Sequence, residues 1–220
     1  MNKTLSIAAL AVAIIAGGTW FLTRPVAPTD TMFGAPIAQD ADVDTIGVIE
    51  MVQGGADATV EVIEYASFTC PHCANFHGDQ YPQIKANYID TGKIRFVYRE
   101  VYFDRPGLWA SMVARCGGPL RYHGIVELIY EQQREWAGSG DPSIIADNLR
   151  KIGKVVGLTD EALDVCMADS ESAQALYTWS ETNREADDIS GTPSFIINGE
   201  PYSNMSYAEF AAVLDEKLAE

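Results

Sequence analysis

Hydrophobic and polar positions in the first half of the globular region predict two strands around one helix. β-Branched and aromatic residues dominate 59–68 and 93–98, as they do in strands. Between them, Pro71 to Tyr88 spaces its apolar side chains so that they can share one helix face. A strand, a helix and a strand in this order predict a βαβ unit, with parallel strands and a right-handed crossover.

The strand pattern stops in the middle of the chain. From about 106 to 186 the pattern is helical and is interrupted by glycine-rich breaks. Asp141, before a proline, and Thr159, before an aspartate, are expected to begin helices. The sequence therefore predicts an α/β fold with an all-helical insertion.

The strand pattern returns near the end of the chain. Two short strands at 194–197 and 200–203 are expected to form a hairpin around Asn198-Gly199. Ser206 and Glu209 then form a capping-box signature ahead of apolar residues at helical spacing. We expect the chain to close with an amphipathic helix.

The N-terminal segment has a different character. Thr4 to Thr23 contains no charged residue and is long enough to cross a bilayer as a helix. A signal peptide has a shorter apolar run before a small-residue cleavage site, for which Ala16-Gly17-Gly18 is a candidate. Because Trp20-Phe21-Leu22 extends the run beyond that point, we expect residues 1–24 to be an uncleaved signal anchor, with a cleaved signal peptide as the alternative.

The segment at 25–47 contains several prolines and aspartates and is expected to form a flexible linker. The globular domain is then expected at 48–220, with its helical insertion at about 106–186. With either kind of leader, this domain would lie on the outer side of a bacterial cytoplasmic membrane.

The chain is strongly acidic, which argues against one class of partner. Its formal net charge is −16, from 15 basic and 31 acidic residues. Lys3 and Arg24 lie in the leader, so residues 25–220 carry −18. Nucleic-acid binding is disfavoured, because phosphate contacts need clustered Lys and Arg side chains. The length of 220 residues argues for one core and against two enzymatic domains.

Candidate chemistry lies in Cys70-Pro71-His72-Cys73, directly after the first predicted strand. A helix that begins here would point unpaired backbone N–H groups and the positive end of its dipole at Cys70, which stabilises a thiolate. A protonated His72 would add to this effect. A lowered pKa makes Cys70 a good leaving group and its disulfide a strong oxidant, with Cys73 as the buried resolving thiol.

A zinc site is the competing interpretation of the same cysteines. Cys116 and Cys166 are single cysteines and supply no second Cys-x-x-Cys knuckle. The redox interpretation is therefore favoured, and we expect neither a metal ion nor a cofactor.

Two segments resemble the DsbA-like proteins of the thioredoxin superfamily. Residues 64–73 (Glu-Tyr-Ala-Ser-Phe-Thr-Cys-Pro-His-Cys) resemble their active-site segment, and residues 191–195 (Gly-Thr-Pro-Ser-Phe) resemble their cis-proline loop. The similarity covers roughly residues 48–220 and includes a helical insertion of the expected size. It implies a thioredoxin fold with an inserted all-helical domain.

The resemblance implies a thiol-disulfide oxidase that donates its Cys70–Cys73 disulfide to unfolded or reduced exported proteins. A DsbB-like membrane partner would re-oxidise it, and the protein is expected to be monomeric and tethered through its N-terminal segment. A disulfide isomerase or reductase of the same fold is the first alternative, because those relatives share a threonine before the proline. A redox-inert client-binding chaperone is the second, although two intact cysteines argue against it.

The resemblance also assigns roles to residues outside the cysteine motif. Pro193 would be cis and would present the Thr192 backbone to an extended client, whereas an ordinary trans proline is the alternative. Glu64 would be a buried acid that relays protons to Cys73; without the resemblance, a surface position at the strand edge is the alternative. His77 is expected to be an exposed helix residue.

Cys116 and Cys166 both fall in the predicted insertion. An even cysteine count in an oxidising compartment favours a structural disulfide between them, and some DsbA-like proteins carry such an additional pair. Closing so long a loop contributes about 3 to 5 kcal/mol in the chain-entropy model. The alternatives are that this pair tunes the active site or that both thiols stay reduced in the core.

Overall fold

The computed structural model describes residues 47–220. The predicted leader at 1–24, and the predicted linker up to residue 46, lie outside the described residues. In the described part of the chain, no helix combines the length and the hydrophobicity that a bilayer crossing requires.

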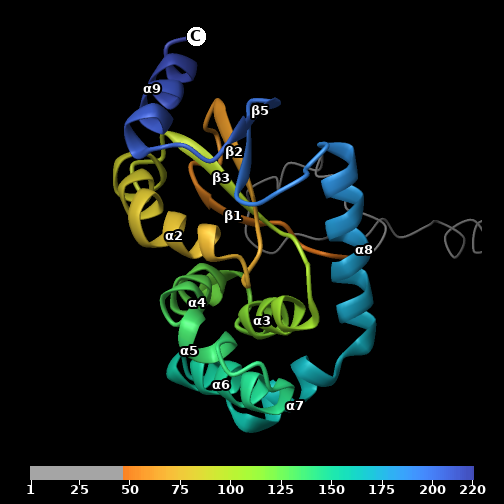
Figure 1. The fold of residues 1–220 in the computed structure, drawn as a ribbon. Helices are drawn as coiled ribbons and strands as arrows, with labels where there is room; N and C mark the ends of the chain where they lie inside the picture. The colour runs from red at the N-terminus through yellow and green to blue at the C-terminus, as the bar shows by residue number, and fades with distance from the viewer. Residues whose placement is uncertain (1–46) are drawn as a thin grey trace, which may run out of the picture. The chain divides into compact units, whose positions relative to one another are not determined.

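A five-stranded mixed sheet forms the centre of the domain (Figure 1). Its strands are β1 (Met51–Gly54), β2 (Val60–Ala66), β3 (Ile94–Glu100), β4 (Ser194–Ile197) and β5 (Glu200–Ser203), in the spatial order β1-β3-β2-β4-β5. The pair β2 and β3 is parallel, as the sequence predicted, and the other neighbouring pairs are antiparallel. Strand β2 lies at the middle of the sheet, so the cysteine motif that follows it in the sequence is attached to a buried strand.

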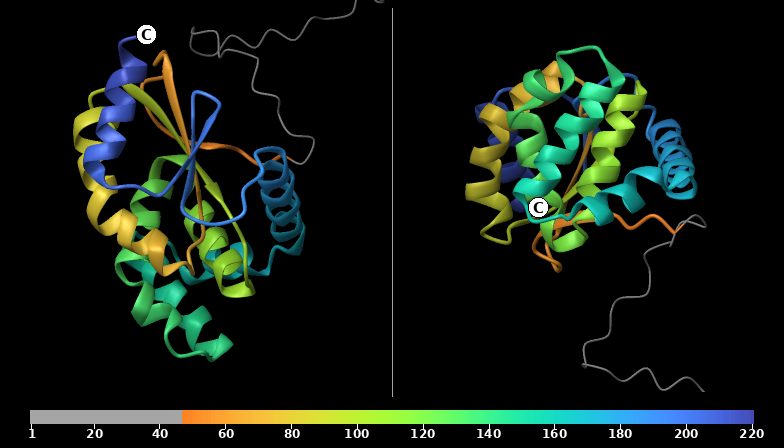
Figure 2. Two further views of the ribbon diagram at one scale, coloured as in Figure 1. Left: turned by 45° about the horizontal axis from the view of Figure 1, so that its top comes forward. Right: turned by 90° about the horizontal axis from the view of Figure 1, so that it is seen from below.

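Helices cover both faces of this sheet (Figures 1 and 2). The helices α2 (Pro71–Ile84) and α9 (Tyr207–Leu218) lie on one face, where Phe76 and Phe210 pack with sheet residues such as Phe195 in one buried cluster. The other face lies towards α8 (Ser170–Ala186), and the Tyr65 hydroxyl donates a 2.5 Å hydrogen bond to Asp187 directly after that helix. Because both faces of the sheet are covered, most residues of β2 and β3 are buried, and these include the charged Glu64 and Glu100.

The predicted helical insertion connects β3 to β4. It contains α3 (Arg105–Cys116), α4 (Pro119–Glu131), α5 (Gln133–Ala137), α6 (Pro142–Val155), α7 (Asp160–Ala168) and α8. Asp141 and Thr159 cap α6 and α7 as expected, because each side chain accepts backbone N–H groups of the first turn. The α/β fold with a helical insertion is therefore confirmed.

Two features of the fold differ from the sequence-based expectation. The edge strand β1 was not predicted, because it has only four residues and ends at Gly54. The helix predicted from Pro71 to Tyr88 is regular only as far as Ile84, and the chain continues as the π-helix η1 (Lys85–Ile89).

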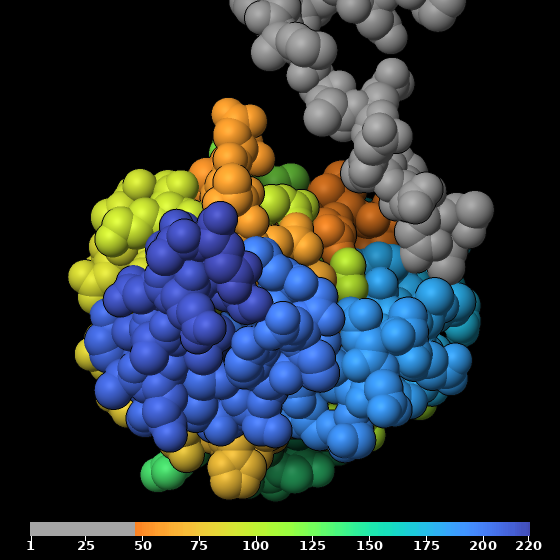
Figure 3. All heavy atoms as spheres, turned by 90° about the horizontal axis from the view of Figure 1, so that it is seen from above, coloured from red at the N-terminus to blue at the C-terminus, as the bar shows by residue number. Residues whose placement is uncertain are grey.

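The final helix closes the fold against the end of this long helical segment. Ser206 and Glu209 form the predicted capping box at the start of α9. The Tyr88 hydroxyl of η1 donates a 2.9 Å hydrogen bond to Asp215 of α9. Figure 3 shows α9, in dark blue, beside the yellow segment that contains η1.

Candidate active site

Cys70 stands at the junction of the central strand and the first helix. It follows β2 after a short turn and is the N-cap of α2, with Pro71 at the first helical position. A proline there is favourable because the first-turn N–H that it lacks has no helical partner. This end of the sheet faces the inserted helices (Figure 1), so the site lies where the two parts of the domain meet.

The surroundings of Cys70 favour its thiolate. A hydrogen bond from the Cys73 thiol, together with the backbone N–H groups of Cys73 and His72, lowers the pKa of Cys70 to about 5, against an opposing effect of burial. Cys70 is half-buried, so an external thiol can reach it. A reactive cysteine combines these two properties.

Cys73 has the opposite environment. It is fully buried, and burial is the main reason that its pKa lies far above its usual value, with the hydrogen bond to Cys70 and the charge of Glu64 adding to the effect. Within one helical turn, the fold therefore places a thiol that ionises readily beside a thiol that keeps its proton.

The loop before β4 approaches the same sulfur. The Thr192–Pro193 peptide bond is cis, and the Cys70 thiol donates a 3.4 Å hydrogen bond to the Thr192 carbonyl oxygen. Residues 122 positions apart in the sequence thus meet at Cys70. The side chain of His72 is exposed on the first turn of α2, next to this meeting point.

Glu64 and His77 form a buried pair beneath the cysteines. Glu64 lies on the central strand β2 with no exposed surface, and both of its carboxylate oxygens are 3.1 Å from Nε2 of His77. The expectation that His77 is exposed is wrong. Its side chain is only 3% exposed, because it projects from the same face of α2 as Cys73 and stacks on Tyr130 at a centroid distance of 4.2 Å.

Gln133 is a site residue that the sequence did not single out. From α5 in the insertion, its side-chain amide donates hydrogen bonds to the carbonyl oxygens of Phe68 (2.8 Å) and Cys70 (2.9 Å). These bonds satisfy two carbonyl groups in the turn that presents Cys70. No short-range pattern marks such a residue, because its partners lie more than sixty positions away.

The other two cysteines lie away from this site. Cys116 ends α3 and Cys166 lies near the end of α7, and the structure joins them by a disulfide with a Cα–Cα distance of 5.9 Å. This bond ties two helices of the insertion together and leaves Cys70 and Cys73 as the free cysteines among the described residues.

Comparison with known proteins shows to which family the chain belongs. The family model described as "Thioredoxin" matches residues 48–216. A Rickettsia bellii protein named protein-disulfide oxidoreductase is 35% identical over 172 residues, which are 78% of this chain and 65% of the relative. The chain thus spans just under two thirds of that relative's length. Disulfide bond formation protein D of Bacillus subtilis is 25% identical over 176 residues, covering 76% of each chain.

The solved structure of alpha-DsbA1 from Wolbachia pipientis has the same arrangement of elements. It superposes with a TM-score of 0.71 at 25% identity, over 77% of this chain and 91% of that one. The predicted thioredoxin fold with a helical insertion is thereby confirmed, and the chain belongs to the thioredoxin family, as a DsbA-like member of the thioredoxin superfamily of oxidoreductases.

Proposed function

We propose that this chain is a thiol-disulfide oxidase that introduces disulfide bonds into exported proteins through Cys70 and Cys73. One observation carries the proposal: an accessible Cys70 whose pKa is lowered to about 5 lies beside a buried Cys73 whose pKa is raised. A stabilised thiolate favours the reduced form of the pair, so the corresponding disulfide is a strong oxidant.

The reaction begins with the disulfide form of the chain. A client thiolate attacks Cys70 Sγ, a client–Cys70 bond forms, and Cys73 leaves with the electron pair of the broken bond. A second client thiolate then attacks the client sulfur of this mixed disulfide, and Cys70 leaves as a stable thiolate. The client loses two electrons and gains a disulfide, while the chain ends with Cys70 and Cys73 reduced.

Cys73 needs a proton when it leaves, because its buried sulfur does not remain a thiolate. In this proposal, Glu64 supplies that proton and takes it back when the pair is re-oxidised. Its hydrogen-bonded partner His77 holds the Glu64 carboxyl group in place. Thr192 and Pro193 provide the backbone edge beside which an extended client aligns.

The cellular setting of the proposal follows the predicted leader. A membrane partner of the DsbB type would accept the two electrons, and the domain would work in the periplasm or at the outer face of the membrane. The chain would act as a monomer, tethered through residues 1–24 or released by cleavage.

Two assays with one protein test this proposal. Catalytic amounts of the chain, with excess oxidised glutathione, should form disulfides in a reduced model protein, and Cys70→Ala should abolish this catalysis. The same amounts should rearrange a scrambled, fully oxidised protein slowly. Fast rearrangement with slow oxidation would favour an isomerase, and no effect in either assay would leave only a client-binding module.

A further inference from the structure

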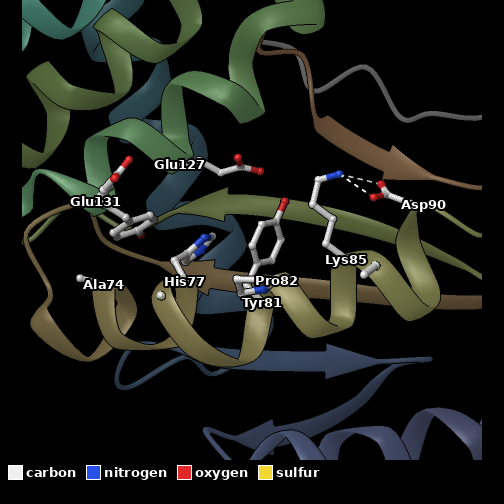
Figure 4. Close-up of a pocket in the computed structure, with 11 residues that line it drawn as sticks. Ala74, His77, Tyr81, Pro82, Lys85, Asp90, Glu127 and Glu131 are labelled. Carbon is white, nitrogen blue, oxygen red and sulfur yellow. Dashed lines mark hydrogen bonds and ion pairs between the residues drawn. The ribbon is translucent and has the colours of Figure 1, made fainter.

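A cavity of about 390 Å³ lies between α2 and α4, on the side of α2 that leads away from the cysteines. It begins at Ala74, the residue after Cys73, and continues past His77 and Tyr81 to Lys85. Figure 4 shows the side chains of His77 and Tyr81 directed from α2 towards α4. The cavity thus lies along the helix that carries the redox site, and Cys70 and Cys73 are not among its lining residues.

Two carboxylates line the α4 side of this cavity. Glu127 and Glu131 are four positions apart on that helix, and neither has an ion-pair partner among the described residues. Like charges at this spacing repel each other, and a cation between them would relieve the repulsion. Lys85 does not fill that role, because its ammonium group is 2.7 Å from Asp90 (Figure 4).

The inner wall offers a polar atom that lacks a partner. Nε2 of His77 faces Glu64, whereas Nδ1 is buried and has no hydrogen-bond partner in residues 47–220. With its proton on Nε2, the imidazole keeps an unpaired acceptor at Nδ1, on a ring that lines the cavity. Tyr81 and Tyr130 provide aromatic surface around it. Burial raises the pKa of Tyr81, and the negative charge of Glu127 adds to this effect.

We infer that this cavity binds the guanidinium group of an arginine side chain on the client protein. Two carboxylates, two aromatic rings and one unpaired acceptor match the donors and the flat face of a guanidinium better than they match a neutral group. An ammonium group presents fewer donors and is more strongly hydrated, so lysine should bind less tightly than arginine. The net charge of −16 on the chain also attracts basic segments.

The inference rests on the proposed function, because the arginine belongs to the protein whose thiol attacks Cys70. His77 lies seven positions along the helix from Cys70, or roughly 10 Å at 1.5 Å per residue. An extended client covers that distance in roughly three residues. The favoured arginine should therefore lie about three residues from the attacking cysteine.

The test uses short dithiol peptides that differ only in one residue, arginine or glutamine, placed three positions from the attacking cysteine. The oxidised full-length chain is mixed with each peptide, and the loss of its Cys70–Cys73 disulfide is followed by acid quenching and thiol alkylation. We expect the arginine peptide to react about ten-fold faster, which corresponds to about 1.4 kcal/mol. The difference should shrink at high salt.

Matched variants locate the effect. The double variant Glu127→Gln/Glu131→Gln should remove the preference for arginine. The control Glu171→Gln/Glu185→Gln changes the net charge equally, at exposed carboxylates of α8 outside the cavity, and should keep the preference. Equal rates for the two peptides in the unaltered chain, or a preference that survives in the first variant, would overturn the inference.

A binding measurement separates this inference from the redox proposal. Peptides in which serine replaces both cysteines cannot react, and the arginine form alone should shift the NMR signals of the His77 ring. Binding of both serine peptides to an equal extent would contradict the arginine site while leaving the oxidase proposal intact. Failure of both dithiol peptides to reduce the chain would overturn the proposed function and the inference with it.

Discussion

The two cysteine pairs of this domain occupy opposite ends of helices. Cys70 is the N-cap of α2, whereas Cys116 is the last residue of α3 and Cys166 lies in the last turn of α7. The N-terminal end of a helix stabilises a thiolate, and the C-terminal end, with its unpaired carbonyl groups, disfavours one. The position at a helix N-terminus thus makes Cys70 a stable leaving group. The positions at helix C-termini make Cys116 and Cys166 poor leaving groups.

The pairs also differ in what their disulfides constrain. Cys70 and Cys73 share one helical turn, so a bond between them closes only a small loop. The bond between Cys116 and Cys166 spans 50 positions and joins two helices. Sequence spacing and helix position together therefore separate a switch from a cross-link within a single fold, and the following predictions test that separation.

The largest expected difference is in catalysis. Replacing Cys70 by alanine should reduce disulfide formation in a reduced client to the uncatalysed rate, because no sulfur remains for the client thiolate to attack. The double variant Cys116→Ala/Cys166→Ala should keep most of the activity. Initial rates of client oxidation under identical conditions compare the two. A double variant as inactive as Cys70→Ala would mean that the second pair takes part in electron transfer.

For stability, the Cys116–Cys166 pair should matter more than the Cys70–Cys73 pair. Removing the Cys116–Cys166 bond should lower the free energy of unfolding by about 4 kcal/mol, the chain-entropy value for a loop of this length. Reducing Cys70–Cys73 in the unaltered protein should instead raise it, because a strongly oxidising disulfide is less stable than its dithiol in the folded state. Urea unfolding of the three forms measures both changes. A stabilising Cys70–Cys73 bond would contradict the comparison.

Gln133 connects the helical insertion to the turn that presents Cys70. Its replacement should change the stability by less than the loss of the Cys116–Cys166 bond. Gln133→Leu keeps the approximate volume of the side chain but leaves the buried Phe68 carbonyl oxygen without its donor. We expect the free energy of unfolding to fall by about 1 to 3 kcal/mol. Urea unfolding measures this change, and Gln132→Leu, at the partly exposed preceding residue, is the control. Equal effects of the two variants would argue against a specific role for Gln133.

The smallest expected effect is the pH dependence of stability in the reduced form. The pKa of Cys70 is about 5 in the folded state and about 8.5 in an unfolded chain. Its thiolate therefore stabilises the fold in full above about pH 8.5, and this contribution decreases as the pH falls and is lost below about pH 5. Solvent screens the partly exposed sulfur, so the effect should be modest.

Urea unfolding of the reduced protein and of Cys70→Ala at several pH values isolates this contribution, because all other groups titrate in both. The stability difference between the two proteins should grow from pH 5 to pH 8.5. A difference that does not change over this range would mean that the fold does not lower the pKa of Cys70.

Local patterns predicted much of this fold. The strand before Cys70, the proline that starts the helix, and the capping box at Ser206 are each encoded within a few residues. The capping residues of α6 and α7 were found for the same reason. By contrast, β1 is too short for a period-two pattern to be recognised, and it is defined by its pairing with β3.

The candidate site was predicted less completely, because some of its contacts are long-range. The carboxylate of Glu64 has a partner that only the packing of α2 on the sheet brings near. A signal for His77 was present, since it lies four positions after the buried Cys73 and four before the buried Tyr81, on one helix face. Gln133 offered no such signal, because the five-residue helix α5 is too short to show a periodic apolar pattern.

The equilibrium reduction potential of the Cys70–Cys73 pair tests the central claim most directly. The full-length chain is equilibrated in glutathione buffers of graded ratio, and free thiols are trapped by alkylation and counted, with Cys116→Ala/Cys166→Ala as the control for the second pair. We predict a strongly oxidising value of about −120 mV, as expected when the helix stabilises the Cys70 thiolate. A value of about −270 mV, typical of thioredoxin, would contradict the proposal that this chain is an oxidase.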